Sequence, residues 1–151
     1  CSSDLLAAKN IKRFGLKDQN LIKYTAGTVG WAFGVVGNGR NYEEGMIVNQ
    51  FVVLSSNIKI GQQFHINSYS YIGHDCIIGD FVTFAPRVSC NGNVIVEDHA
   101  YIGTGAVIKQ GTPEKPLVIG RGAVVGMGAV VTKSVPAGVT VVGNPARPLV
   151  K

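Results

Sequence analysis

The chain has 151 residues, of which 46% are hydrophobic and only 15% charged, with 20 Gly and a formal net charge of +5. This length suits one domain, and no apolar run is long enough to cross a bilayer as a helix. The basic residues are scattered and lack the interleaved aromatic residues of single-strand binders. We therefore expect neither a membrane nor a nucleic acid as a partner.

The first part of the chain predicts a short helix followed by a lead-in. Residues 4–14 have a capping residue in Ser3 or Asp4 and a glycine, Gly15, at the position that commonly follows a helix. One face of this helix would carry Ala7, Ile11 and Phe14. We assign residues 1–35 to this helix and its lead-in.

From residue 36 to 151 the sequence predicts a β-solenoid. A large apolar residue recurs every six positions, and the residue two places before the next recurrence is mostly small or β-branched. The register is Ile60, Ile66, Ile72, Ile78, Phe84, Cys90, Val96, Ile102, Ile108 and then, after a break, Ile119, Val125 and Val131. A period of six fits neither an α-helix nor a hairpin meander, but it fits an all-β coil wound around a triangular prism, with one strand and one corner per repeat. The many glycines suit corners that need positive φ.

The repeat is interrupted once and then ends. Ile108 and Ile119 are separated by one repeat plus five residues, and the segment between them is polar with two prolines. We expect a loop over residues 111–118, which is either a binding element or a tolerated surface insertion. The Pro- and Gly-rich residues 136–151 are predicted to cap the open end of the coil.

Stacking at about 18 residues per turn separates the three histidines, His65, His74 and His99, onto different sides of the prism. We therefore predict no metal site. Cys76 and Cys90 fall on inward positions, where thiols act as small apolar groups in a reducing compartment, so we predict a cytoplasmic protein. The N-terminal Cys1-Ser2-Ser3 leaves open a lipoprotein-like start, although a fragment boundary explains it equally well.

His74 differs from the other histidines because it follows Ile72-Gly73 at a corner and precedes Asp75. A carboxylate beside an imidazole can fix its tautomer and raise its basicity, which would suit a general base. The alternative is a solvated corner histidine.

Several motifs together resemble the hexapeptide-repeat acyltransferases, and within them the group that contains sialic acid O-acetyltransferases and UDP-amino-sugar N-acetyltransferases. The matching stretches are Tyr71-Ile72-Gly73-His74-Asp75, Ile102-Gly103-Thr104-Gly105-Ala106, Val125-Gly126-Met127-Gly128-Ala129 and Gly143-Asn144-Pro145-Ala146-Arg147. The resemblance implies a left-handed parallel β-helix, acetyl-CoA as cosubstrate, a sugar or nucleotide sugar as acceptor, and a homotrimer with sites between subunits.

The resemblance also implies roles for individual residues. His74 would be the catalytic base, supported by Asp75. Asn67, Ser68 and Thr83 would bind the acceptor, and Thr83 stands where some relatives carry a second histidine. The residues expected along coenzyme A are Gly103, Thr104, Gly105, Gly126, Met127, Gly128, Pro145 and Arg147.

Two other functions remain open from the sequence. A regular solenoid could serve as a non-catalytic scaffold for assembly. A metalloprotein like the γ-type carbonic anhydrases is disfavoured by the histidine spacing.

Overall fold

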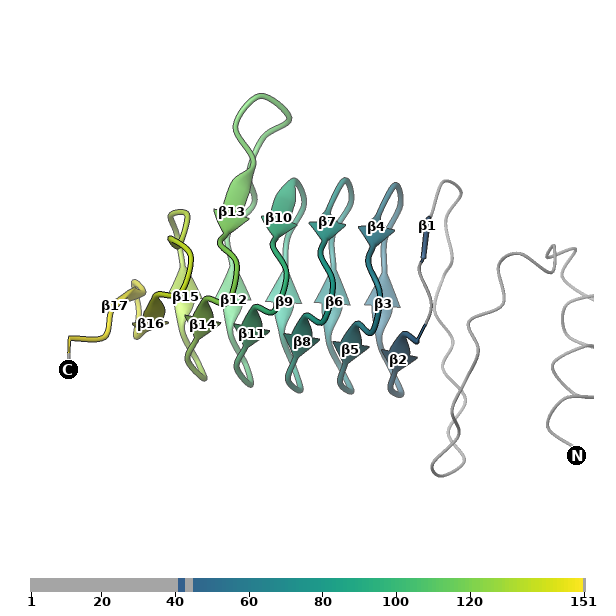
Figure 1. Cartoon of the computed structure of the whole chain (residues 1–151), viewed down its shortest axis with the longest axis horizontal. Coiled ribbons are helices and arrows are strands. Elements are labelled where there is room, and N and C mark those ends of the chain that lie inside the picture. Colours follow the sequence, from purple (N-terminus) through teal and green to yellow (C-terminus); the bar gives the residue numbers. More distant parts are fainter. Residues whose placement is uncertain (1–40, 43–44, 151) are drawn as a thin grey trace, which may run out of the picture.

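The computed structural model describes residues 41–42 and 45–150, and every regular element in these ranges is a β-strand (Figure 1). The helix expected over residues 4–14, and the rest of the lead-in up to residue 35, lie outside the described residues. No helix in the described part of the chain could cross a bilayer.

The strands form three sheets that make the faces of a prism, which we call sheets A, B and C. Sheet A contains β1 (Asn41–Tyr42), β4 (Lys59–Ile60), β7 (Ile77–Ile78), β10 (Val94–Val96) and β13 (Leu117–Ile119). Sheet B contains β2 (Ile47–Val48), β5 (His65–Ile66), β8 (Thr83–Phe84), β11 (Tyr101–Ile102), β14 (Val124–Val125), β16 (Thr140–Val142) and β17 (Arg147–Pro148). Sheet C contains β3 (Val53–Leu54), β6 (Tyr71–Ile72), β9 (Ser89–Cys90), β12 (Val107–Ile108) and β15 (Val130–Val131).

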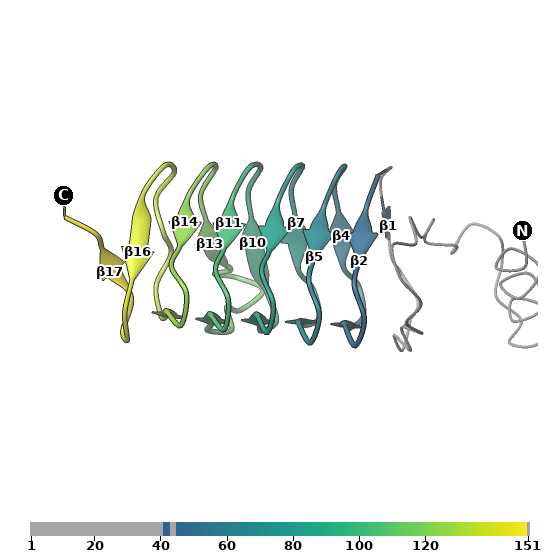
Figure 2. The ribbon, with the colours of Figure 1, turned by 90° about the horizontal axis from the view of Figure 1, so that it is seen from below.

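The chain visits sheets B, C and A in turn, and strands of successive turns pair in parallel; the final pair, β16 with β17, is antiparallel. In Figure 1 the strands of sheet C rise at the back and those of sheet A descend at the front as the coil advances, which makes the β-helix left-handed. Figure 2 shows sheet B running along the whole coil. The predicted fold class is confirmed.

The apolar residue of each repeat fills the interior of the prism. Ile66, Ile72 and Ile102 are fully buried, as are the small residues Ala100 and Ala106 that precede the next repeat. Each two-residue strand between β3 and β15 buries one side chain and turns its neighbour outward, so a two-residue strand per face is enough to build a continuous core.

The glycines that follow the buried aliphatic residues serve close stacking of successive turns. A Cβ on Gly73 would lie 2.5 Å from the backbone nitrogen of Gly92, and a Cβ on Gly103 would lie 2.6 Å from that of Met127. Positive φ occurs further round each corner, and nine non-glycine residues adopt it, among them Phe51 (φ 59°) and His99 (φ 60°). Glycine is therefore used here mainly for close approach and only in part for positive φ.

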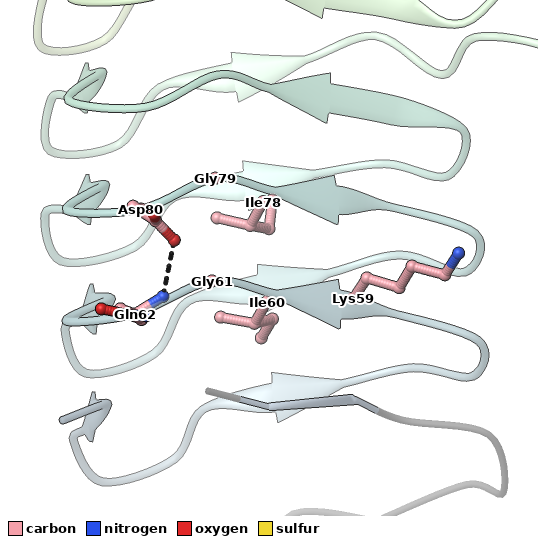
Figure 3. A pocket seen from close by; sticks show the side chains of 7 residues that line it. All are labelled: Lys59, Ile60, Gly61, Gln62, Ile78, Gly79 and Asp80. Atoms are coloured by element: carbon pink, nitrogen blue, oxygen red, sulfur yellow. Dashed lines mark hydrogen bonds between the residues drawn. The ribbon is translucent and has the colours of Figure 1, made fainter. Parts of the chain in front are cut away.

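Side-chain ladders tie the corners of adjacent turns together. Between sheets A and B, the Asp80 carboxylate accepts a hydrogen bond from the backbone nitrogen of Gln62 at 2.8 Å, and Asp98 accepts one from the backbone nitrogen of Asp80 at 3.0 Å. Figure 3 shows the first of these contacts within a shallow groove on that side of the prism. These carboxylates satisfy corner N–H groups that the strand ladder leaves unpaired.

The interruption of the repeat appears as a longer turn between β12 and β13, which projects from the prism (Figure 1). In the strand ladders before this turn a backbone nitrogen bonds to a carbonyl seventeen residues later, as from Thr83 to Ala100, whereas from Tyr101 the partner is Ala123, twenty-two residues later. The five extra residues are thus absorbed at one corner, and the strands beyond it keep their register.

Two glycines two residues apart allow a test of close stacking. We expect Gly103→Ala to lower the free energy of unfolding by about 1–3 kcal/mol, because its Cβ would meet the backbone of the next turn. Gly105 has φ +69° and no atom within 4 Å of an added Cβ. Since Asn tolerates this conformation, Gly105→Asn should cost less than about 1 kcal/mol. Urea unfolding measures both changes, and equal losses would show that close approach is not the constraint.

Candidate active site

His74 and Asp75 lie at the corner where sheet C passes into sheet A, which we call the C–A edge. Nδ1 of His74 lies 2.7 Å from Oδ2 of Asp75, and the two side chains are 44% and 43% exposed. The Nδ1–H therefore donates to the carboxylate, and Nε2 carries the lone pair. This arrangement leaves a partly exposed basic nitrogen at the edge of the prism.

Asp75 is held from a second side by the turn below. Its φ is 56°, its backbone nitrogen donates to the Ser56 carbonyl, and Nδ2 of Asn57 donates to its Oδ1 at 2.5 Å. The hydrogen bonds from Asn57 and then from His74 lower the pKa of Asp75 below its ordinary value. The carboxylate is thus ionised at neutral pH and oriented toward the imidazole.

Gly92, one turn above, makes room for the imidazole. A Cβ at this position would lie 2.7 Å from both Cε1 and Nε2 of His74. The two turns are joined by a hydrogen bond from the backbone nitrogen of Asn93 to the carbonyl of His74, at 3.0 Å. Asn57 and Gly92 were not singled out from the sequence as site residues. Their spacing of eighteen residues from Asp75 and His74 respectively is the signal that could have found them.

The predicted acceptor-binding residues lie on or beside the corner between sheets B and C, which we call the B–C edge. Asn67 is half-buried, and its amide is engaged: Nδ2 donates to the Phe84 carbonyl and Oδ1 accepts from Asn49, both at 2.9 Å. Ser68 follows it on the same corner. Thr83 faces outward from β8, between His65 and Tyr101 of the adjacent strands.

The residues predicted to contact coenzyme A line the same B–C edge further along the coil. Thr104 and Met127 follow one another on adjacent turns, and the Met127 side chain is 81% exposed. Gly105 and Gly128 adopt positive φ and face open space, so that a ligand could approach the backbone there. Pro145 and Arg147 are exposed beside and within β17, which pairs antiparallel with β16 at the end of sheet B. Gly103 and Gly126, by contrast, face the next turn.

The two groups of predicted residues do not meet within one chain. His74 stands after β6, at one end of the sheet C strands, whereas Thr104 and Met127 stand before β12 and β15, at the other end. Sheet C separates the two edges. A site that uses both therefore needs the C–A edge of one copy and the B–C edge of another.

The other two histidines lie on different sides of the prism from His74, as the spacing of eighteen residues per turn predicts. His65 is on sheet B, 3.4 Å from the amide of Asn49, and His99 stacks on Phe81 at the corner between sheets A and B. The two cysteines among the described residues, Cys76 and Cys90, are buried free thiols. Their mutual hydrogen bond and burial raise the pKa of Cys90 well above its ordinary value, which makes it a poor nucleophile.

No protein-family model matches the chain. Its sequence is 66% identical over 103 residues to GDP-perosamine N-acetyltransferase of Escherichia coli O157:H7, an alignment that covers 68% of this chain and 47% of that protein. Among solved structures, WeeI from Acinetobacter baumannii AYE is 70% identical with a TM-score of 0.70, over 73% of this chain and 53% of WeeI. A mutant of perosamine N-acetyltransferase from Caulobacter crescentus, in complex with CoA and GDP-perosamine, is 28% identical with a TM-score of 0.72, over 78% and 54% of the two chains.

The chain belongs to the hexapeptide-repeat acyltransferases. It spans about half the length of the curated relative and the solved structures described above. The family assignment rests on the solenoid, which is the part that the structure describes.

The hydrogen bond from Asn57 gives a prediction about Asp75. In Asn57→Ala we expect the pKa of Asp75 to rise toward its ordinary value of 3.8, because the largest influence that lowers it is lost. Carboxyl-carbon NMR titration measures this pKa directly. The pKa of Asp75 is lower in the folded chain than in the unfolded chain. The contribution of ionised Asp75 to the stability of the fold is therefore fully present above the unfolded pKa and is lost as pH falls through the folded pKa. An unchanged pKa in the variant would contradict the assigned contact. Ser56→Ala, one residue away on the same corner, is the matched control.

Proposed function

We propose that the chain forms the transfer unit of a sugar N-acetyltransferase, which moves an acetyl group from acetyl-CoA to the amine of a nucleotide-linked amino sugar. The pairing of His74 with Asp75 at an exposed edge is the observation that carries the proposal. The 66% identity to a GDP-perosamine N-acetyltransferase supports it. The same relative favours an amine over a hydroxyl as the acceptor group, and GDP-perosamine or a close analogue as the acceptor.

His74 acts as the general base of a direct transfer. Its Nε2 accepts the proton that the amine releases as the nitrogen attacks the thioester carbonyl carbon. The new C–N bond forms, the C–S bond breaks, and coenzyme A leaves as a thiolate that takes up a proton. Asp75 keeps the Nδ1–H of the imidazole in place and stabilises the imidazolium. Asn57 and Gly92 are positioning residues, since they act on Asp75 and on the space around the ring.

The complete site lies between two copies of the chain. One copy supplies His74 from its C–A edge, and its neighbour supplies Thr104 and Met127 from the B–C edge. The separation of these edges by sheet C supports this arrangement. A closed homotrimer would form three equivalent sites. The buried thiols of Cys76 and Cys90 suit the reducing cytoplasm, where we place the reaction.

The role of His74 is tested by its removal. We expect His74→Ala to lower kcat with acetyl-CoA and GDP-perosamine about a hundredfold or more, with little change in KM for acetyl-CoA, because a general base acts on the chemical step. His99→Ala removes an exposed histidine from another corner and is the control. Wild-type turnover in His74→Ala would disprove the assignment. A thermal-shift assay with acetyl-CoA separates the two functions: a rise in melting temperature favours a transferase, and no rise favours a non-catalytic scaffold.

A site shared between copies can be tested by mixing two inactive variants. His74→Ala loses the base, and Gly105→Trp obstructs the opposite edge, where the backbone now faces open space. Co-assembly of equal amounts should restore about a quarter of the wild-type rate, because a random trimer pairs an intact His74 with an intact B–C edge in one cleft out of four. No recovery in verified mixed oligomers would mean that one chain supplies the whole site.

A further inference from the structure

A second concave site lies on the C–A edge, beneath the projecting turn between β12 and β13. It encloses about 640 Å³. Its lining residues are Lys109, Gln110, Gly111, Thr112, Lys115, Pro116, Leu117, Thr132, Lys133 and Ser134. They come from two successive turns of the coil, so that the pocket is bounded by the prism on one side and by the inserted residues on the other.

The pocket is positively charged without a balancing acid. Lys109, Lys115 and Lys133 line it, and no aspartate or glutamate does. None of these three ammonium groups forms an ion pair within the described residues; the only ion pair there that involves a lysine or arginine joins Arg121 to Asp98. Glu114 belongs to the same turn but lies outside the lining. Three like charges around one cavity favour an anion with several charges, and lysine is a common phosphate ligand.

Hydrogen bonds hold the backbone of the inserted turn, including that of Lys115, in a defined position. Thr112 and Lys115 exchange backbone hydrogen bonds of 3.0 and 3.1 Å, and the Thr112 hydroxyl also accepts from the Lys115 nitrogen. The base of the turn is fastened to the coil, where Gly111 donates to Gly92 and Leu117 donates to Asn93. These bonds hold the backbone of the inserted turn in place, and the ammonium group of Lys115 is left to meet a ligand.

The pocket stands directly above the proposed catalytic histidine. Gly92 stacks on His74, and Gly111 stacks on Gly92 through a 3.0 Å hydrogen bond between backbone groups. At about 4.8 Å per turn, the pocket begins about 10 Å from His74 and reaches about 14 Å at the turn of Lys133. The pantetheine arm of coenzyme A separates its thioester from its diphosphate by a comparable length.

From these observations we infer that the pocket formed by Lys109, Lys115 and Lys133 binds the diphosphate of coenzyme A. The pocket and His74 of one active site then belong to the same copy of the chain. The inference rests on the proposed use of acetyl-CoA as donor. The nucleotide sugar also carries a diphosphate that is esterified at both ends, so the two ligands share this chemistry, and the donor is the source that matches the distance from His74.

The test measures binding by titration calorimetry with the full chain. We expect Lys109→Gln/Lys133→Gln to raise the Kd of coenzyme A about tenfold or more and to weaken its dependence on salt, while the Kd of pantetheine, which lacks the diphosphate, stays unchanged. Lys59→Gln removes an exposed lysine of sheet A and should leave both constants unchanged. Unfolding curves for each variant verify that the fold is retained. An unaltered Kd for coenzyme A in the folded double variant, with GDP binding also unaltered, overturns the inference.

Two further measurements separate the possible outcomes. If the double variant loses affinity for GDP and keeps that for coenzyme A, the pocket holds the acceptor's diphosphate and the assignment to the donor is wrong. Turnover with S-acetylpantetheine isolates the chemistry: the double variant should keep the wild-type rate, and His74→Ala should lose it. Weaker coenzyme A binding in the double variant together with full activity of His74→Ala would uphold the pocket and refute the proposed base.

Discussion

The structure depends on successive turns stacking at hydrogen-bond distance along three parallel ladders. Backbone nitrogens such as those of Ile47 and His65 bond to carbonyls seventeen residues later, at 2.8 and 3.0 Å. This spacing admits only small atoms between the corners, which explains the positions of Gly73 and Gly103. Before the inserted turn it also places residues above their counterparts one turn earlier, so that side chains eighteen residues apart become neighbours.

The candidate site is a consequence of that stacking. Asn57, Asp75 and Asn93 follow one another along the C–A edge, and Asn57 orients the carboxylate that in turn orients His74. Gly92 supplies space for the ring because it lies one turn above it. The inserted turn projects from the same edge, since the five extra residues are accommodated at a corner without shifting the strands. The stacked turns thus place Nε2 of His74 and the lysine-lined pocket along the same edge of the prism.

The proposed chemistry would be divided between two edges of the prism. The C–A edge carries the imidazole of His74, oriented by Asp75, and the B–C edge offers exposed backbone near Gly105 and Gly128. Within one copy, sheet C separates the two edges. Assembly of copies would bring them together, which couples activity to oligomeric state and makes mixed oligomers informative.

The sequence by itself determined the prism, its core and the prominence of His74, because a strict period of six leaves one way to bury the aliphatic residues. Burial of Cys76 and the separation of the three histidines also followed from arithmetic on the repeat. Only the tertiary structure decided that the Asn67 amide is engaged in a hydrogen bond to the backbone of the next turn, and that Asn57 donates a hydrogen bond to Asp75. It also decided that Lys109, Lys115 and Lys133 line a common pocket. These contacts depend on side-chain rotamers and on how the inserted turn folds back over the coil, and neither is encoded in the periodicity of the chain.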